Sequence, residues 1–72
     1  MMYKGKNVNL AGYIALKKKD YEGKPSWMWK DEGIVYAIMD YHSSMGEFTD
    51  EDWDTINELG LDEVGQMCEE QD

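Results

Sequence analysis

The chain has 72 residues and a net charge of −9, and its acids and bases are separated along the sequence. All seven lysines lie before Glu47, together with five acids, whereas the residues from Glu47 onward hold eleven acids and no base. There is no arginine, the usual reader of phosphates and guanine edges, so this composition argues against direct binding of DNA or RNA.

The size and the few metal-ligating residues set further limits. The length predicts a single domain, residues 1–72. Cys68 is the only cysteine and His42 the only histidine, so neither an internal disulfide nor a Cys/His zinc site is expected. A single cysteine suits a reducing compartment, no apolar run approaches the ~20 residues of a membrane span, and no signal peptide is evident. We therefore expect a cytoplasmic protein without a cofactor.

Two periods compete in residues 8–17. Apolar residues recur at every second position, which fits a strand. Leu10, Tyr13 and Ile14 also fit one face of a helix, with Asn9 as its N-cap. The alternation covers more residues, so it favours a strand, with the helix as the alternative.

A second strand is predicted after a turn. Residues 20–25 carry turn chemistry, including a glycine and the only proline. Residues 26–30 then predict a strand with Trp27 and Trp29 on one face. Pairing with residues 8–17 would give an N-terminal antiparallel hairpin.

The apolar run that follows predicts a helix over residues 33–45. Ile34, Ile38 and Tyr41 fall on one helical face, and Gly46 follows as a C′ residue. A third strand is the alternative, because a short apolar run does not distinguish the two by itself.

The start of the next helix has the clearest local signal. Thr49 and Asp52 have the spacing of a capping box, with aspartate in place of the usual longer acid. Phe48 and Trp53 stand at the two positions of a hydrophobic staple. A helix from Thr49 to Leu59 is therefore predicted.

Glycine marks the end of this acidic helix. Gly60 predicts the stop, and Ile56 and Leu61 occupy the paired apolar positions of a Schellman motif. Asp62 is the predicted cap of a short last helix, although Gly65 inside it lowers the helix propensity. The fold class expected from these elements is α+β: a hairpin or three-stranded sheet packed by two or three helices, the C-terminal ones acidic.

The predicted acidic helix carries a row of carboxylates. Asp50, Asp54 and Glu58 recur at i, i+4 and i+8 and so share a face. Acids in the first turn are favoured by the helix dipole, which is an ordinary structural explanation. The helix dipole does not explain Glu58 or the later acids, because these like charges repel one another and the sequence offers no nearby base. The row is therefore either a working face or a solvated one.

Other chemistry is weakly supported. Asp50, Asp52 and Asp54 match the first positions of a calcium loop, but the required glycine and final glutamate are absent. A helix–turn–helix over residues 33–59 would present acids to phosphates, so it does not predict DNA binding. His42 and the two serines after it do not form a catalytic dyad, because neighbouring residues of a helix point about 100° apart. Cys68 fits a small core residue, so no catalytic residue is assigned.

These features predict a non-enzymatic inhibitor that docks an acidic, aromatic-edged face on a basic protein surface, in the manner of a nucleic-acid mimic. Its partner would be a nucleic-acid-binding protein. The residues assigned to this face are Asp50, Glu51, Trp53, Asp54, Glu58, Asp62 and Glu63.

In size and charge the chain resembles small phage-encoded inhibitors of host defence or DNA-processing enzymes, including anti-CRISPR proteins, and acidic immunity proteins and antitoxins. The resemblance implies an inhibitor in the cytoplasm of a host. A structural or regulatory subunit is the alternative, and a homodimer pairing Lys17–Lys19 with the acidic helix is a further option.

Overall fold

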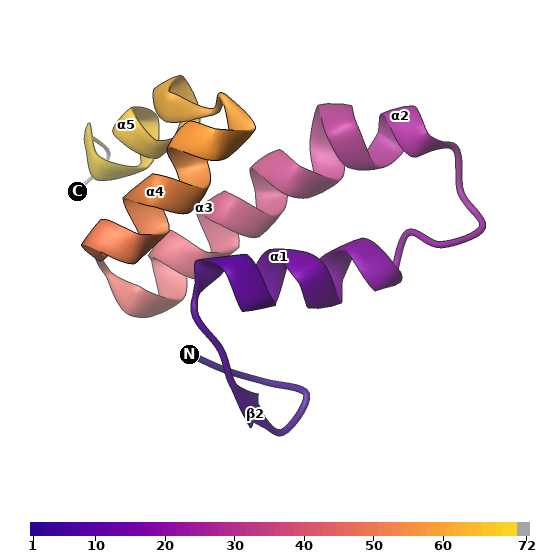
Figure 1. Cartoon of the computed structure of the whole chain (residues 1–72), viewed down its shortest axis with the longest axis horizontal. Helices are drawn as coiled ribbons and strands as arrows, with labels where there is room; N and C mark the ends of the chain where they lie inside the picture. Colours follow the sequence, from indigo (N-terminus) through magenta and orange to yellow (C-terminus); the bar gives the residue numbers. More distant parts are fainter. Residues whose placement is uncertain (71–72) are drawn as a thin grey trace.

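A computed structural model describes residues 1–70, and the last acid, Asp72, lies outside them. Its elements in chain order are β1 (Met2–Tyr3), β2 (Lys6–Asn7), α1 (Leu10–Lys19), α2 (Ser26–Met28), the π-helix η1 (Trp29–Gly33), α3 (Ile34–Met45), α4 (Asp50–Leu59) and α5 (Asp62–Glu70). The fold is small and mostly helical, with one antiparallel hairpin (Figure 1). This is consistent with a small α+β class, although helices dominate it.

The strand predicted over residues 8–17 is wrong, and the alternative helix is present as α1. Asn9 is the N-cap, and its side-chain oxygen accepts a hydrogen bond from the Gly12 amide at 2.9 Å. Leu10, Tyr13 and Ile14 are buried on one helical face. The period of two was misleading because it gave Gly12 and Leu16, which are not part of the buried core, the same weight as Leu10 and Ile14.

The hairpin lies earlier than predicted. β1 and β2 pair in antiparallel register, with Tyr3 opposite Lys6. The turn between them places Lys4 and Gly5 at φ values of 51° and 78°, the left-handed conformations that a tight hairpin turn needs. The two strands are too short for a pattern of alternation to reveal them.

The strand predicted over residues 26–30 is also wrong. This segment is helical, and α2, η1 and α3 follow one another without a break from Ser26 to Met45. Trp29 is buried, whereas Trp27 is 57% exposed, so the two rings do not share a face. Within residues 1–70 no third strand is present.

Gly33 explains the irregular turn in η1. A Cβ atom there would lie 2.6 Å from the Trp29 ring and 2.9 Å from the Tyr21 ring. These two rings stand 5.4 Å apart and press against the backbone of the long helix. Only glycine allows this approach, and the widened π turn accommodates it.

The C-terminal predictions are confirmed by their caps. Thr49 accepts from the Asp52 amide at 3.2 Å, while the Asp52 carboxylate accepts from the Thr49 amide at 3.1 Å, which completes the capping box. Gly46 and Gly60 both take the left-handed conformation after their helices.

The connection from α4 to α5 is the predicted Schellman stop. The Leu61 amide donates to the Ile56 carbonyl at 3.1 Å, and Gly60 donates to Asn57 at 3.1 Å. Asp62 is the first residue of α5 and not its cap, because Leu61 precedes the helix and its carbonyl accepts the first helical hydrogen bonds.

The core forms where α1 and α5 pack on α3. Its rings are arranged as a chain of contacts, from Tyr3 against Tyr13 at 4.9 Å to Phe48 against Trp53 at 5.4 Å. The buried apolar residues are Leu10, Tyr13, Ile14, Trp29, Ile34, Ala37, Ile38, Tyr41, Phe48, Ile56 and Cys68.

Asp52 is the charged residue at the centre of this packing. It is only 1% exposed, and its second oxygen accepts from the Leu10 amide at 3.2 Å, across 42 positions of sequence. Leu10 is the first residue of α1, so one carboxylate satisfies amides at the N-termini of α1 and α4. Both helix dipoles favour a negative charge at this point.

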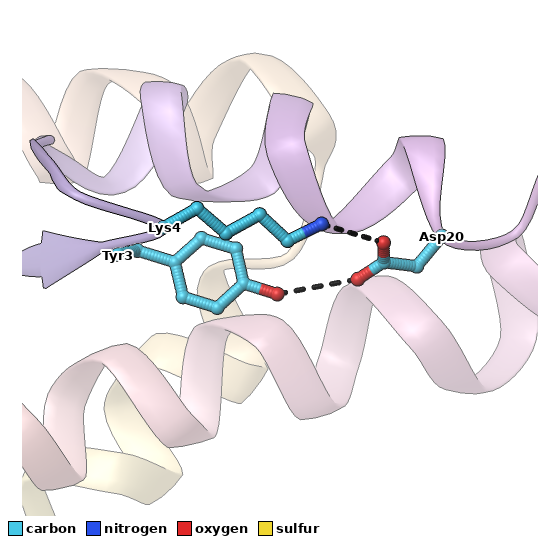
Figure 2. A network of polar contacts seen from close by, with 3 residues as sticks. All are labelled: Tyr3, Lys4 and Asp20. Atoms are coloured by element: carbon cyan, nitrogen blue, oxygen red, sulfur yellow. Dashed lines mark hydrogen bonds and ion pairs between the residues drawn. The ribbon is translucent and has the colours of Figure 1, made fainter.

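The hairpin is attached to the far end of α1 by a smaller polar network (Figure 2). Asp20 accepts from Lys4 Nζ at 2.9 Å and from the Tyr3 hydroxyl at 3.2 Å. The hydrogen bond from Lys4 holds the pKa of Asp20 below its ordinary value, and the same contact raises the pKa of Lys4. The contact is exposed, so it orients the hairpin and adds little stability.

Replacing Asp52 by asparagine should destabilise the protein. The amide keeps one acceptor oxygen, so either the Leu10 or the Thr49 amide would face an NH₂ group in a buried site. We expect a loss of about 1–3 kcal/mol in urea unfolding. Asp54→Asn, on the exposed side of α4, is the matched control and should change stability by about 0.5 kcal/mol or less. Equal losses in the two variants would contradict the central role of Asp52.

Tyr41 should make stability sensitive to alkali. Burial, together with the nearby Asp52 carboxylate and its hydrogen bond, raises the pKa of Tyr41 from 10.0 to about 12. The neutral form is therefore favoured in the folded state, and this contribution is complete below pH 10 and lost as pH rises toward 12. The free energy of unfolding, measured in urea between pH 10 and 12, should decrease less steeply with pH for Tyr41→Phe than for the wild type. Parallel curves would show that Tyr41 is not responsible.

Candidate protein-interaction face

The acidic residues of α4 divide into one buried side chain and an exposed row. Asp52 and Ile56 face the core, whereas Asp50, Asp54 and Glu58 are exposed on the outer side. Glu51 is exposed beside this row. The helical spacing therefore places the predicted carboxylates together, as expected from the sequence.

Helix α5 continues this acidic surface. Its first turn exposes Asp62 and Glu63, and its last turn exposes Glu69 and Glu70. The helix packs against α4 and α3, and the α4–α5 pair occupies one end of the long axis of the molecule (Figure 1). The term acidic face is used below for the exposed acids of α4 and α5: Asp50, Glu51, Asp54, Glu58, Asp62, Glu63, Glu69 and Glu70.

No lysine neutralises the acidic face. Among residues 1–70, no lysine forms a salt bridge with an acid of α4 or α5, and the lysine salt bridge that is present joins Lys4 to Asp20. The negative charge is consequently directed at solvent.

Trp53 does not stand out from this face as an anchor. It is half-buried, with its ring edge-on to Phe48 at 5.4 Å, which confirms the predicted hydrophobic staple. Its outer ring edge also covers Gly65 of α5, where a Cβ atom would lie 2.8 Å from the indole. Trp53 therefore holds α4 and α5 together beneath the acids.

Two exposed methionines, Met39 and Met67, lie where α3 packs against α5. Met39 and Met67 are 37% and 56% exposed and line a hollow of about 70 Å³ between α3 and α5. The exposed aromatic residues are Trp27 and Tyr36, on α2 and α3. The exposure of Met39 and Met67 is not predictable from the sequence, because methionines at helical spacing equally fit a core.

His42 and Cys68 are both buried within the packing. The His42 ring lies 4.8 Å from Phe48, and Cys68 faces the core from α5. Within the described chain no three His, Cys, Asp or Glu side chains are grouped to hold a metal ion. None of the helices formed by residues 1–70 has the length and apolar character needed to cross a membrane.

In comparisons with known proteins, no family model, curated protein or solved structure matches the chain.

Gly65→Ala should test the close contact between α4 and α5. The new Cβ would lie 2.8 and 2.9 Å from two ring atoms of Trp53, which must then shift. Overpacking of this kind lowers the free energy of unfolding by about 1–3 kcal/mol, and the higher helix propensity of alanine offsets about 1 kcal/mol of this loss. Thermal or urea unfolding should show a net loss of about 1 kcal/mol, whereas Gln66→Ala at the exposed neighbouring position should not. A more stable Gly65→Ala protein would mean that Trp53 does not pack there.

Proposed function

We propose that this protein is a non-enzymatic inhibitor that docks its acidic face on a basic surface of a nucleic-acid-binding protein. The observation that carries the proposal is the unrelieved row of carboxylates on α4 and its continuation on α5. Successive turns of the helix place Asp50, Asp54 and Glu58 about 6 Å apart along its axis. Such spacing presents a regular series of negative charges to lysines or arginines.

The rigid support of the row favours this function. The capping box fixes the start of α4, the Schellman stop fixes its end, and Trp53 packs between α4 and α5. A face held in this way loses little conformational entropy on binding, which makes electrostatic docking more effective. The exposed Met39 and Met67, where α3 packs against α5, would supply adaptable apolar contacts.

A structural or regulatory subunit is the second candidate. Trp27 and Tyr36 are 57% and 59% exposed, and both lie outside the acidic helices. Exposed tryptophan and tyrosine often anchor stable interfaces. Assembly driven by these rings would respond weakly to salt, whereas docking through the acidic face would weaken steeply as salt increases.

The test compares two charge variants as baits in host-cell lysate. The first replaces Asp50, Asp54 and Glu58 by Asn, Asn and Gln. The second removes three charges elsewhere, by Glu22→Gln, Asp31→Asn and Glu32→Gln, at positions that are also exposed. Captured proteins are identified at low and high salt, and association is then measured by surface plasmon resonance with the purified partner.

We expect the acidic-row variant to associate roughly tenfold more slowly at low salt, because steering by a local field commonly contributes 10-fold or more. The difference should narrow as salt is raised, and the control variant should associate like the wild type. The wild-type protein should also inhibit the nucleic-acid binding of the partner. Equal association rates for both variants would reduce the acidic row to a solvated surface.

A further inference from the structure

A pocket lies at the end of the molecule opposite the acidic face. It has a volume of about 470 Å³ and is formed by the last turn of α1, the connection that follows, and the start of the α2–η1 helix. Figure 1 places this connection and the α4–α5 pair at opposite ends of the long axis. The lining of the pocket includes Ala15, two aromatic side chains, Tyr21 and Trp29, and several charged side chains.

The floor of the pocket is aromatic and firmly held. Tyr21 and Trp29 pack at 5.4 Å, and both rings contact the backbone at Gly33, where a side chain would collide with them. The π-helix η1 carries Trp29 at its first position. Such widened turns are frequent at functional sites, so the irregularity coincides with the pocket that it helps to shape.

The rim of the pocket is basic in an otherwise acidic protein. Lys18, Lys19, Lys24 and Lys30 line it together with a single acid, Glu22. These are four of the seven lysines in the chain, drawn from three consecutive segments. Lys24 Nζ lies 5.1 Å from the centre of the Tyr21 ring, so charge and aromatic surface meet in one place.

The acids beside the rim lysines in the sequence, Asp20, Asp31 and Glu32, do not line the pocket. Asp20 precedes Tyr21 but is bound by Lys4 Nζ at 2.9 Å and by the Tyr3 hydroxyl (Figure 2). Both oxygens of Asp20 therefore accept hydrogen bonds from the hairpin, and four lysines line the pocket with Glu22 as the acid among them. The volume lies within the range of about 300–1,000 Å³ that is usual for small-molecule sites.

We infer that this pocket binds a small organic anion with an aromatic or apolar body. The aromatic floor would take the body, and the lysines would hold a sulfonate, carboxylate or phosphate group at the rim. The inference does not depend on the proposed inhibitor function, because the two surfaces share no residue.

The experiment uses a matched pair of fluorescent probes with the full chain at about 0.15 M salt. The first probe, 1-anilinonaphthalene-8-sulfonate, carries an aromatic body and an anionic group. The second, N-phenyl-1-naphthylamine, has the same body without the sulfonate. We expect the sulfonate probe to bind with one-to-one stoichiometry, and at least about tenfold more tightly than the neutral probe, because charge-assisted contacts are the stronger ones.

Three variants locate the binding. Lys18→Gln with Lys30→Gln removes two rim charges and should weaken binding of the sulfonate probe roughly tenfold. Lys6→Gln with Lys17→Gln removes the same charge outside the pocket and should leave the affinity unchanged. Ala15→Phe, at an exposed position of α1 that lines the pocket, should abolish binding by filling it.

Circular dichroism and thermal melts establish that each variant is folded before its affinity is compared. No binding of the sulfonate probe to the wild-type protein would overturn the inference. Equal affinity for the neutral probe would overturn it too, since the rim lysines would then be irrelevant. An unchanged affinity in both the double rim variant and Ala15→Phe would place the probe elsewhere and have the same consequence.

Discussion

The fold depends on a single buried carboxylate that joins two helix N-termini. Among residues 1–70 no lysine forms a salt bridge with Asp52, and burying a charge without hydrogen bonds costs several kcal/mol. Backbone amides at Leu10 and Thr49 donate hydrogen bonds to its two oxygens instead. The arrangement fixes where α1 starts relative to α4, so the N-terminal and C-terminal parts of the chain are held in register by one side chain. If this acid were exposed, water would have to satisfy the Leu10 and Thr49 amides at the two helix N-termini.

The C-terminal half was predictable because its signals are local. The pair Thr49 and Asp52, followed by Gly60, encodes a start and a stop within twelve residues, and the structure contains both. The exposed row on α4 then follows from helical spacing alone. The spacing predicts that Asp52 caps α4. It does not predict that Asp52 is buried and also accepts a hydrogen bond from the first residue of α1. That role depends on Leu10, 42 positions away, and no local pattern contains it.

The N-terminal half was predicted less well for a related reason. The segment 8–17 has both a strand period and a helix period. The helix is favoured because Asn9 and the distant Asp52 accept hydrogen bonds from amides in its first turn. The two tryptophans of the stretch 26–30 stand two positions apart, which is the spacing of one strand face. The stretch is helical because Gly33 lets Trp29 and Tyr21 pack against the following turn. The lysine-rimmed pocket likewise combines residues that only the fold brings together.

The separation of charge along the chain becomes a separation in space. The molecule extends 34 Å along its longest axis, whereas charges in water are screened over about 8 Å at physiological ionic strength. The lysines at the α1–α2 end therefore do not neutralise the acids of α4 and α5, and the acids do not expel an anion from the distant pocket. At low salt the screening length grows to about 30 Å, and the net charge of −9 would then act on the whole molecule. Ionic strength thus decides whether the two ends behave as one acidic body or as two surfaces of opposite character.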